Sequence, residues 1–539
     1  MSKRGRRMPS VMTHRFSQVP KANIPRSTFD RSFGYKSTFS SGLLIPFYVD
    51  EALPGDTFNL KMQGFARMAT PIHPIMDNLV LETFFFAVPN RILWDNWVKF
   101  MGEQRNPGDS TDFTIPQISS PPGNGWASMS LGDYFGLPVN TAQPYSVSAL
   151  PFRAYSKIWN EWFRDENLAN SLVENVDDGP DSYVNYRVTR RGKRHDYFTS
   201  CLPWPQKGES VSIPLGDTAP VVSTDDIVYL NTEAYNTGTM QVVAGAGSNI
   251  TFSGTSSGAL ALKFAREQDQ AGATGLETDL TSATAVTINE LRQGFQIQKM
   301  LERDARGGTR YTEKIRAHFG VTSPDARQQR PEYLGGGRSP VVISPVAQTQ
   351  RTDQDESPLG NLAAIGTVSV AGHGFMKSFT EHCTLIGVLC VRADLTYSQG
   401  VDRMWLRKTI YDFYWPALSH IGEQAVETQE IYKTGVQAED EVVFGYQERY
   451  AEYRYKPSKI TGLFRTNVSG NNTSLDTWHL SEYFSTPPVL NEAFIEEDPP
   501  VGRVQAVQTE PQFIFDSWSL LRCARPMPVY GVPGLIDHF

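Results

Sequence analysis

The sequence predicts a mainly β protein whose strands form a β-sandwich or jelly roll, and three observations lead to this prediction. Short apolar runs of strand length, bounded by Pro, Gly, Asp and Asn, recur along the chain. Strands do not alternate with helices in the way that a parallel sheet requires, and no repeat of fixed period appears. Strands joined by long excursions therefore favour a sandwich over an α/β enzyme fold.

The composition is that of a folded, soluble protein. Of 539 residues, 40% are hydrophobic and 12% aromatic, which indicates a large core or extensive interfaces. Four cysteines without a CxxC pair indicate neither a disulfide framework nor a zinc site. The basic N-terminus is not followed by an apolar stretch, and no apolar run is long enough to span a bilayer. We expect a protein made in a reducing cytoplasm.

Basic residues concentrate in residues 1–40, which we interpret as an N-terminal arm. Residues 1–36 carry nine bases and one acid, and the remaining 41 bases and 57 acids give a net charge of −16. This contrast predicts a polyanionic partner that the arm contacts, although a merely solubilising tail is an alternative. The predicted nucleic-acid-binding residues are Lys3, Arg4, Arg6, Arg7, Arg15, Lys21, Arg26, Arg31 and Lys36.

Aromatic residues are interspersed among these Lys and Arg residues. They are expected to stack on unpaired nucleotide bases while the Lys and Arg side chains neutralise phosphates. They are Phe16, Phe29, Phe33 and Tyr35. No base-reading motif accompanies them, so binding should tolerate any sequence. Two further basic stretches occur. The first, Arg187–Arg194, is expected to line a charged inner surface. The other, Arg303–Arg316, predicts either a solvated helix face or ion pairs between subunits.

The strands are expected in two blocks of sequence. In the first, GLLIPFYVD and LVLETFFFAV are β-rich runs, and the intervening ALPGDTF contains a turn. In the second, residues 340–455, the runs VVISPV, IGTVSVAGHG, TLIGVLCVRAD and EVVFGYQERYAEYRY have the same character. Residues 515–539, rich in Pro and aromatic residues, predict an ordered, extended C-terminal arm. Residues 41–539 are thus interpreted as one domain with long insertions.

Two helical signals interrupt the β pattern. The first places six apolar side chains on one face: Phe152, Tyr155, Ile158, Trp159, Trp162 and Phe163. The second begins at the capping-box pair Thr287 and Glu290 and ends at Gly307–Gly308. A shorter helix follows, from about Thr309 to Gly320.

Residues 206–286 differ in composition from the rest of the chain. This window carries three bases and nine acids, and 29 of the 50 residues from 237 to 286 are Gly, Ser, Thr or Ala. Such a composition fits a surface insertion better than a core element. A flexible linker is the alternative, but the strand-like and helical sequences on either side favour an excursion from a single domain.

Catalytic signatures are almost absent. The sequence has no phosphate-binding loop, no HExxH, no GxGxxG after a strand and no EF-hand loop. The single GxSxG match, Gly254–Gly258, lies in a tract of small residues where chance explains it. Four possible metal ligands, His373, His382, Cys383 and Cys390, lack zinc-site spacing, and Cys390 is expected in a buried strand. We predict no catalytic residue, no metal site and no cofactor.

The acidic cluster Glu496–Asp498 leaves a second functional class open. Paired carboxylates with many Trp and Tyr residues would suit a carbohydrate-active enzyme or lectin with a β-sandwich fold. An exposed, solvated turn before Pro499–Pro500 explains the cluster more simply. That class would predict a stable monomer that binds sugars saturably.

Four long motifs resemble the major capsid proteins of gokushoviruses, a branch of the microviruses, which are small single-stranded-DNA bacteriophages. The motifs are DEALPGDTF at 50–58, ATPIHPIMDNLVLETFFFAVPNRILWDNWVKFMGEQ at 69–104, RYTEKIRAHFGVTSPDARQQRPEYLGG at 310–336 and SWSLLRCARPMPVYGVPGL at 517–535. The resemblance covers nearly the whole chain except about 206–286. A non-capsid nucleic-acid-binding protein would need a basic body, which this chain lacks.

The resemblance implies an eight-stranded jelly roll with long inserted loops. Sixty copies would form a T=1 icosahedral shell around a circular single-stranded DNA genome, assembled in the host bacterial cytoplasm. The implied partners are other copies of the chain, the genome, internal DNA-condensing and scaffolding phage proteins, and a host receptor. The variable insertion would project at the threefold axes and contribute to host attachment. The two predicted helices would either pack on the jelly roll or lie at subunit contacts.

Overall fold

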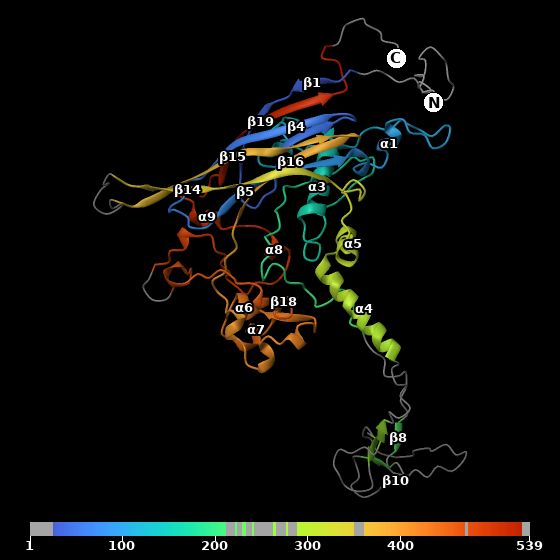
Figure 1. Cartoon of the computed structure of the whole chain (residues 1–539), viewed down its shortest axis with the longest axis vertical. Helices are drawn as coiled ribbons and strands as arrows, with labels where there is room; N and C mark the ends of the chain where they lie inside the picture. Colours follow the sequence, from blue (N-terminus) through green and yellow to red (C-terminus); the bar gives the residue numbers. More distant parts are fainter. Residues whose placement is uncertain are drawn as a thin grey trace, which may run out of the picture. The chain divides into compact units, whose positions relative to one another are not determined.

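The computed structural model describes residues 25–211, 221–223, 229–232, 240–241, 262–265, 276–278, 288–349, 360–468 and 473–530 (Figure 1). The chain divides into two compact units. One contains Met1–Pro205 and Ala305–Phe539, and the other contains Gln206–Asp304. Among the residues described, no helix is both long enough and apolar enough to cross a membrane.

Two antiparallel sheets form the first unit's framework. The six-stranded sheet contains β1 (Ser27–Asp30), β2 (Phe33–Phe39), β4 (Thr57–Met68), β14 (Val342–Ala347), β15 (Leu362–Ser378) and β19 (Phe513–Arg525). The four-stranded sheet contains β3 (Ile45–Ala52), β5 (Leu79–Pro89), β13 (Glu332–Pro340) and β16 (Cys383–Ala393). Two smaller sheets have two strands each: β6 (Gln117–Ser119) with β7 (Ser146–Ser148), and β17 (Glu423–Glu427) with β18 (Val443–Glu448).

The order of the strands identifies the sandwich. The neighbours are β2-β19-β4-β15 in one sheet and β13-β5-β16-β3 in the other. Along the chain these eight strands alternate between the sheets, except that β5 and β13 are consecutive in the four-stranded sheet; β1 and β14 are additional strands of the six-stranded sheet. This arrangement confirms the predicted mainly β sandwich, and its strand order is that of a jelly roll.

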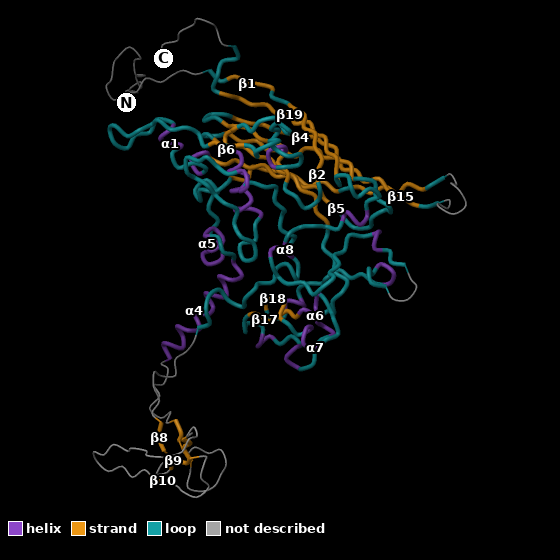
Figure 2. Tube along the Cα trace, turned by 180° about the vertical axis from the view of Figure 1, so that it is seen from behind, coloured by secondary structure: helices purple, strands orange, loops and turns teal. Residues whose placement is uncertain are grey.

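The two sheets differ in how their faces are covered. Along β19, buried and exposed residues alternate strictly from Phe513 to Cys523, because successive side chains of a strand point to opposite faces. Every residue of β16 is buried, so the four-stranded sheet is covered on both faces. No described segment of the chain therefore covers one face of the six-stranded sheet (Figure 2).

Aromatic side chains dominate the core between the sheets. Phe39 stacks on Phe513 with ring centroids 5.5 Å apart, and Phe47 meets Phe85 edge to face at 5.5 Å. Phe58 is fully buried in the same cluster. Rings of this size bury about 150–250 Å² each, so this layer is a major source of the sandwich's stability.

Strand β13 approaches its neighbours so closely that it accepts only glycine at three positions. A Cβ on Gly336 would lie 2.0 Å from the carbonyl oxygen of Thr83 in β5. A Cβ on Gly337 would lie 2.2 Å from the ring of His373 in β15. The backbone at Gly335 adopts a φ of 156° and lies next to Gly374. The run Gly335–Gly337 therefore brings the two sheets together at this edge.

Helices and long loops cover the outer face of the four-stranded sheet. The first predicted helix forms as α3 (Leu150–Ile158) and continues as one wider turn over Trp159–Phe163. Its predicted apolar face is buried in a second cluster with Phe86 and Val388. This helix therefore packs on the sandwich, which is the first of the two positions that the sequence left open for it. The other short helices are α1 (Trp97–Phe100), α2 (Leu131–Tyr134), α8 (Glu492–Ile495) and α9 (Val501–Val504).

One buried ion pair fastens this outer layer. Arg153 of α3 donates two hydrogen bonds to the carboxylate of Asp181, at 2.8 and 2.6 Å. It also donates to the carbonyl oxygens of Leu93 and Asp177. The Tyr186 hydroxyl donates to the same Asp181 carboxylate at 2.5 Å. Both charged side chains are almost fully buried. Arg153 also pairs with the exposed carboxylate of Asp177 at 3.3 Å, so Asp181 supplies the main but not the whole compensation for its charge.

A third cluster lies beside the two-stranded β17–β18 sheet, whose strands are connected through α6 (Thr428–Ile431) and α7 (Gln437–Asp440). Tyr197, Phe198, Phe444 and Phe494 pack there. We call this part of the first unit the β17–β18 lobe. The helix α5 (Tyr311–Phe319) also belongs to the first unit and ends at Gly320, as predicted, with a left-handed φ of 69°.

The second unit contains short strands and most of one long helix. The strands are β8 (Val221–Ser223), β9 (Tyr229–Thr232), β10 (Met240–Gln241), β11 (Leu262–Ala265) and β12 (Leu276–Thr278). They form the sheets β10-β9-β11 and β12-β8. Helix α4 (Ile288–Gly307) ends at the predicted glycines, and Phe295 and Met300 on its predicted apolar face are exposed. The GxSxG match lies outside the described residues.

The predicted terminal arms contribute strands to the sandwich. Of residues 1–40, Ser27–Asp30 and Phe33–Phe39 form β1 and β2. Of residues 515–539, those up to Arg525 belong to β19, which pairs with β1 and β2 on one side and with β4 on the other.

Candidate nucleic-acid interface

Three of the nine predicted binding bases lie in the described part of the arm, and all three have partners within the chain. Arg26 donates to the carbonyl oxygen of Gly55 at 2.5 Å and to the hydroxyl of Thr57. Arg31 makes a bidentate, half-buried pair with Asp50, and Lys36 makes an exposed pair with Asp516 at 2.9 Å. The other six, Lys3, Arg4, Arg6, Arg7, Arg15 and Lys21, lie outside the described residues.

Two aromatic residues of the arm, Phe33 and Tyr35, have a structural role instead of the predicted stacking role, whereas Phe16 lies outside the described residues. Phe33 stacks on Tyr48 at 5.6 Å, and Tyr35 packs edge-on against Phe47 at 6.5 Å. The hypothesis that Phe33 and Tyr35 stack on nucleotide bases is therefore wrong. The cause is the two-residue period of β2, which turns both rings toward the core.

The open face of the six-stranded sheet carries an alternative set of aromatic and basic side chains. Phe65 on β4 and Trp518 on β19 are 52% and 51% exposed. Trp518 faces Gly34 of β2 and Gln63 of β4 across the sheet, where the missing side chain of Gly34 makes room for the indole. We call this surface the open sheet face; its residues are Lys36, Lys61, Phe65, Arg67, Ile514, Asp516, Trp518, Leu520 and Arg522.

The charge on the open sheet face is positive. Lys61, Arg67 and Arg522 have no ion pair among the described residues, whereas Asp516 is paired with Lys36. Asp30, at the margin, has a pKa below its ordinary value because Ser32 donates hydrogen bonds to it and Arg522 lies nearby. Unpaired cations beside exposed aromatic rings match the requirements of single-stranded nucleic acid, namely phosphate neutralisation and base stacking. Nothing in this pattern reads base edges.

The two internal basic stretches form ion pairs within the chain. Arg191 and Arg392 both pair with Glu82, whose pKa they lower against the opposing effect of burial. Arg194 pairs with Asp394 at 2.9 Å, and Arg306 pairs with Glu423. Both stretches border one cavity of about 990 Å³, next to Trp162, Phe163 and α5. Their charges are thus used largely to hold the outer layer together.

The acidic cluster is not the exposed turn that the sequence predicts. Asp498 is exposed and pairs with Arg190 at 2.8 Å, but Glu497 is only 1% exposed. One oxygen of Glu497 accepts the backbone N–H of Ala393 at 3.2 Å. Burial raises the pKa of Glu497 to about 7, against the opposing effect of Arg392. The prediction of a solvated turn is therefore wrong for Glu497, because β16 packs against it.

Glu497 should make stability depend on pH. Its pKa is higher in the folded than in the unfolded chain, so its favourable contribution is complete below about pH 4.5 and is lost as the pH rises through 7. Glu497→Gln, which stays neutral, should therefore gain up to about 3 kcal/mol relative to the wild type between pH 5 and pH 8. Thermal unfolding of both proteins across this range measures the gain. A difference that does not change with pH would contradict it.

The four possible metal ligands do not form a site. The ring of His373 is hydrogen-bonded to the hydroxyls of Thr83 at 2.9 Å and Ser339 at 3.1 Å, between the two sheets. Cys390 is fully buried within β16, as predicted. In the described ranges, no group of three or more His, Cys, Asp or Glu side chains is placed to hold a metal ion.

Comparison with known proteins gives full-length matches. The model of the family described as "Capsid protein (F protein)" matches residues 17–535. "Capsid protein VP1" of Bdellovibrio phage phiMH2K is 46% identical over 535 residues, covering 98% of both chains. The protein of the same name from Chlamydia phage 1 is 44% identical over 99% of both chains. That of Spiroplasma virus 4 is 35% identical over 98% of both chains.

Proposed function

Because the chain belongs to the capsid protein (F protein) family and is thus a structural major capsid protein of the virion, we propose that sixty copies form a T=1 icosahedral shell. In this proposal the shell encloses a circular single-stranded DNA genome, and the protein has no enzymatic role. The match over residues 17–535 carries the proposal. Such a shell needs heterologous contacts around its fivefold and threefold axes and a self-complementary twofold contact.

The mass of the assembled particle tests the shell. Sixty copies of the 60.2 kDa chain give a protein mass of about 3.6 MDa. Mass photometry of the protein expressed alone, and then with its companion phage proteins, should show this species or pentamers that lead to it. A strictly monomeric chain under both conditions would overturn the proposal and revive the lectin-like alternative.

We further propose that DNA is bound by the basic arm together with the open sheet face. The described part of the arm enters the six-stranded sheet as its edge strand β1, where Ser27 pairs with Arg525. The arm therefore joins the sheet at the margin of the open sheet face. Lys61, Arg67 and Arg522 would neutralise phosphates, and Trp518 and Phe65 would stack on bases. Recognition would be independent of sequence because these groups contact backbone and ring faces only.

DNA binding by the open sheet face should depend on its cations and its indole. The triple variant Lys61→Gln/Arg67→Gln/Trp518→Ser should bind a single-stranded oligonucleotide at least about tenfold more weakly, since each stacked base contributes roughly 1–3 kcal/mol. The slope of log K against log salt should become shallower by about 1.4 through two lost phosphate contacts. Deletion of residues 2–20 should likewise reduce the DNA packaged per shell.

The matched control for these variants is Arg105→Gln, which removes one exposed base from a loop outside the sheet. It should bind and package DNA like the wild type. Equal DNA content in intact and truncated particles would exclude the arm, and an unchanged salt slope in the triple variant would exclude the open sheet face.

Host attachment is proposed for the insertion at 206–286. Its acidic composition, poor in core-forming residues, supports this role. Assembly would occur in the cytoplasm of the host bacterium, with scaffolding and internal DNA-condensing phage proteins as partners and a cell-surface receptor as the target. Particles without the insertion should adsorb poorly to host cells, and normal adsorption would contradict this role.

A further inference from the structure

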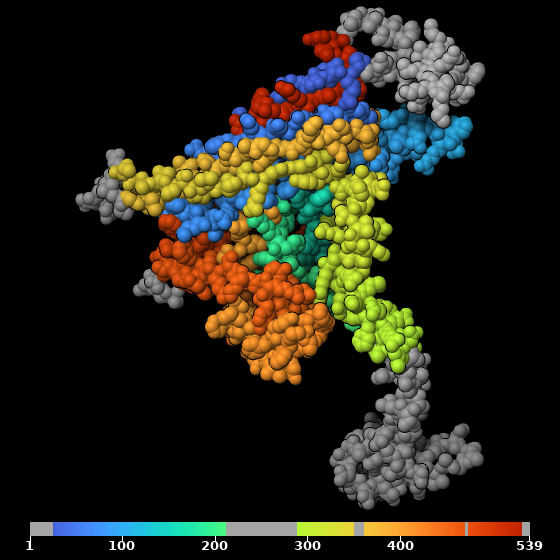
Figure 3. All heavy atoms as spheres, viewed as in Figure 1, coloured from blue at the N-terminus to red at the C-terminus, as the bar shows by residue number. Residues whose placement is uncertain are grey.

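The β17–β18 lobe exposes an unusual number of aromatic side chains. Nine large apolar residues from two neighbouring segments are each between 44% and 70% exposed. We call them the aromatic belt; its members are Met404, Trp405, Ile410, Tyr411, Phe413, Tyr414, Trp415, Tyr453 and Tyr455. The lobe that carries them is coloured orange in Figure 3.

These side chains are exposed on a backbone that is held in place. The hydroxyl of Tyr450 and the guanidinium of Arg449 both donate to the carbonyl oxygen of Tyr411, at 3.0 and 3.1 Å. The indole of Trp415 donates to the carbonyl oxygen of Ile410 at 2.9 Å. The Tyr453 hydroxyl accepts the backbone N–H of Tyr414 at 3.3 Å. A surface fixed in this way loses little conformational entropy when a partner covers it.

Most charged side chains around the aromatic belt are already in ion pairs. Ion pairs join Arg403 to Glu430, Arg407 to Glu452, Lys408 to Glu441, Arg454 to Glu448 and Lys456 to Asp402. A polyanion would find few free cations there, in contrast to the open sheet face. Exposed Tyr and Trp with balanced charge are typical of protein–protein contacts.

The exposed apolar area is large enough for a specific interface. Seven aromatic residues, each with about 150–250 Å² of surface and about half exposed, present roughly 700 Å². The largest apolar patch on an ordinary monomer is about 300–600 Å², and a standard interface buries about 800 Å² on each partner. The aromatic belt therefore supplies nearly a whole partner surface.

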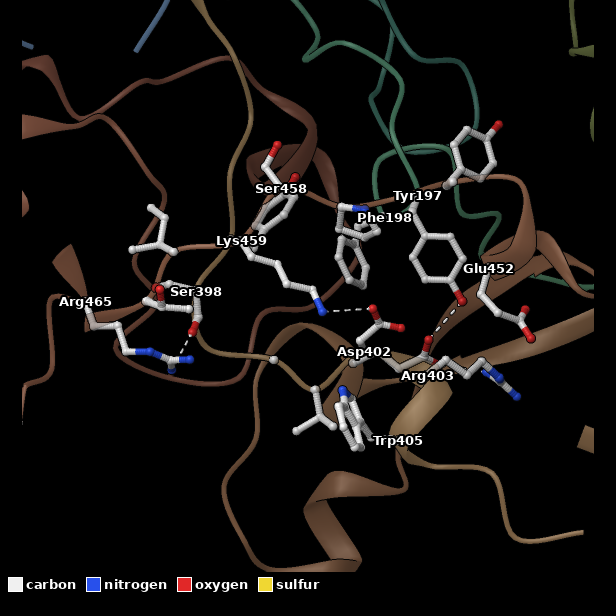
Figure 4. A pocket seen from close by; sticks show the side chains of 18 residues that line it. Tyr197, Phe198, Ser398, Asp402, Arg403, Trp405, Glu452, Ser458, Lys459 and Arg465 are labelled. Carbon is white, nitrogen blue, oxygen red and sulfur yellow. Dashed lines mark hydrogen bonds and ion pairs between the residues drawn. The ribbon is translucent and has the colours of Figure 1, made fainter. Parts of the chain in front are cut away.

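A pocket lies at the edge of the aromatic belt. It has a volume of about 350 Å³, and Trp405 and Tyr455 belong both to its wall and to the belt. Figure 4 shows Tyr197, Phe198 and Trp405 lining it, with Lys459 directed at Asp402 at 3.2 Å. Interfaces gain most of their binding energy where a side chain of the partner fills such a pocket.

We propose that the aromatic belt is a contact surface for a second copy of this chain, with the adjoining pocket receiving an apolar side chain of that copy. The inference rests on the proposed assembly and adds the surface through which it proceeds. A second copy is the favoured occupant because a coat protein meets its own copies during assembly, and because area and charge suit a protein partner. Single-stranded DNA, the alternative occupant, would require unpaired cations.

The test removes apolar area from the belt without touching its internal hydrogen bonds. Trp405→Ser/Ile410→Ser truncates side chains that are 70% and 64% exposed, so the chain should fold with the wild-type thermal midpoint. Self-association, followed by sedimentation velocity over a concentration series, should weaken by at least about tenfold. The control, Met76→Ser/Val184→Ser, truncates side chains that are 69% and 71% exposed outside the belt and outside the open sheet face, and it should associate like the wild type.

The outcomes separate the belt from the T=1 shell. If the belt variant self-associates like the wild type, or if the control loses as much self-association, the proposed belt contact is wrong. The proposed T=1 shell is unaffected by either result. If instead the wild type forms only oligomers that are not shells, and the belt variant loses them, that result would support the belt contact and overturn the proposed T=1 shell. If the belt variant unfolds, oxidative footprinting of the wild type decides: Trp405 should be at least about fivefold less reactive in assemblies than in free chains. Equal reactivity would exclude the contact.

Discussion

Gly336→Ala is expected to destabilise the sandwich by about 3 kcal/mol and to prevent assembly of the chain into particles. The added methyl group would lie 2.0 Å from the carbonyl oxygen of Thr83, which is main chain and cannot rotate away. Strands β13 and β5 would have to separate, and their paired residues from Glu332 to Pro340 would lose register. Thermal unfolding and the yield of soluble chain measure the loss.

The control for this prediction is Gly502→Ala in α9. Apart from its chain neighbours and the backbone of its own helix, no atom lies within 4 Å of its Cβ position, and its φ is not in the left-handed region. Because alanine is the better helix former, this variant should be neutral or slightly more stable. A Gly336→Ala protein with the thermal midpoint of the Gly502→Ala protein would show that β13 does not approach β5 as closely as described.

Asp181→Asn should cost about 3 kcal/mol, because it leaves the buried Arg153 guanidinium with only the exposed carboxylate of Asp177, at 3.3 Å, as a counter-charge. The change is nearly isosteric, so the loss reports the charge and not a cavity. Burial alone would raise the pKa of Asp181, but hydrogen bonds from Arg153 and Tyr186 lower it below its ordinary value. The carboxylate is therefore ionised at neutral pH, and chemical unfolding near pH 7 measures its removal.

Two variants make this prediction specific. Asp516→Asn removes the same charge from an exposed pair with Lys36 and should cost no more than about 1 kcal/mol. Arg153→Met/Asp181→Leu removes both buried charges and should recover part of the loss, since neither ion then lacks a partner. If the single Asp181→Asn variant were as stable as Asp516→Asn, the pair would not fasten α3 to the loop that carries Asp181.

Local patterns in the sequence predicted most of the elements but not the sidedness of the sheets. The face of Phe152, Tyr155 and Trp159 follows from helical spacing within one segment, and it is buried as predicted. Which face of β19 points outward depends on pairing with β4 and β2, hundreds of residues away. The exposure of Trp518 was therefore missed, and Phe33 was assigned to the wrong role.

Burial of charged groups was equally hard to predict from sequence. Glu497 stands between Glu496 and Asp498 and reads as part of a solvated turn, yet it is enclosed because Ala393 of a distant strand hydrogen-bonds to it. Arg191 and Arg392 share Glu82 although the three are far apart in the chain. The basic stretches were visible as composition, but their intrachain partners depend on the tertiary fold.

The place of β19 has a consequence for synthesis of the chain. This last strand pairs with β1 and β2 from the beginning of the chain and with β4, so it completes the sheet from within. A ribosome must therefore release nearly the whole polypeptide before the sheet can close, and such distant pairings form slowly. We expect prematurely terminated chains to lack a finished sandwich. Only chains synthesised through β19 could then close the sheet and join a particle.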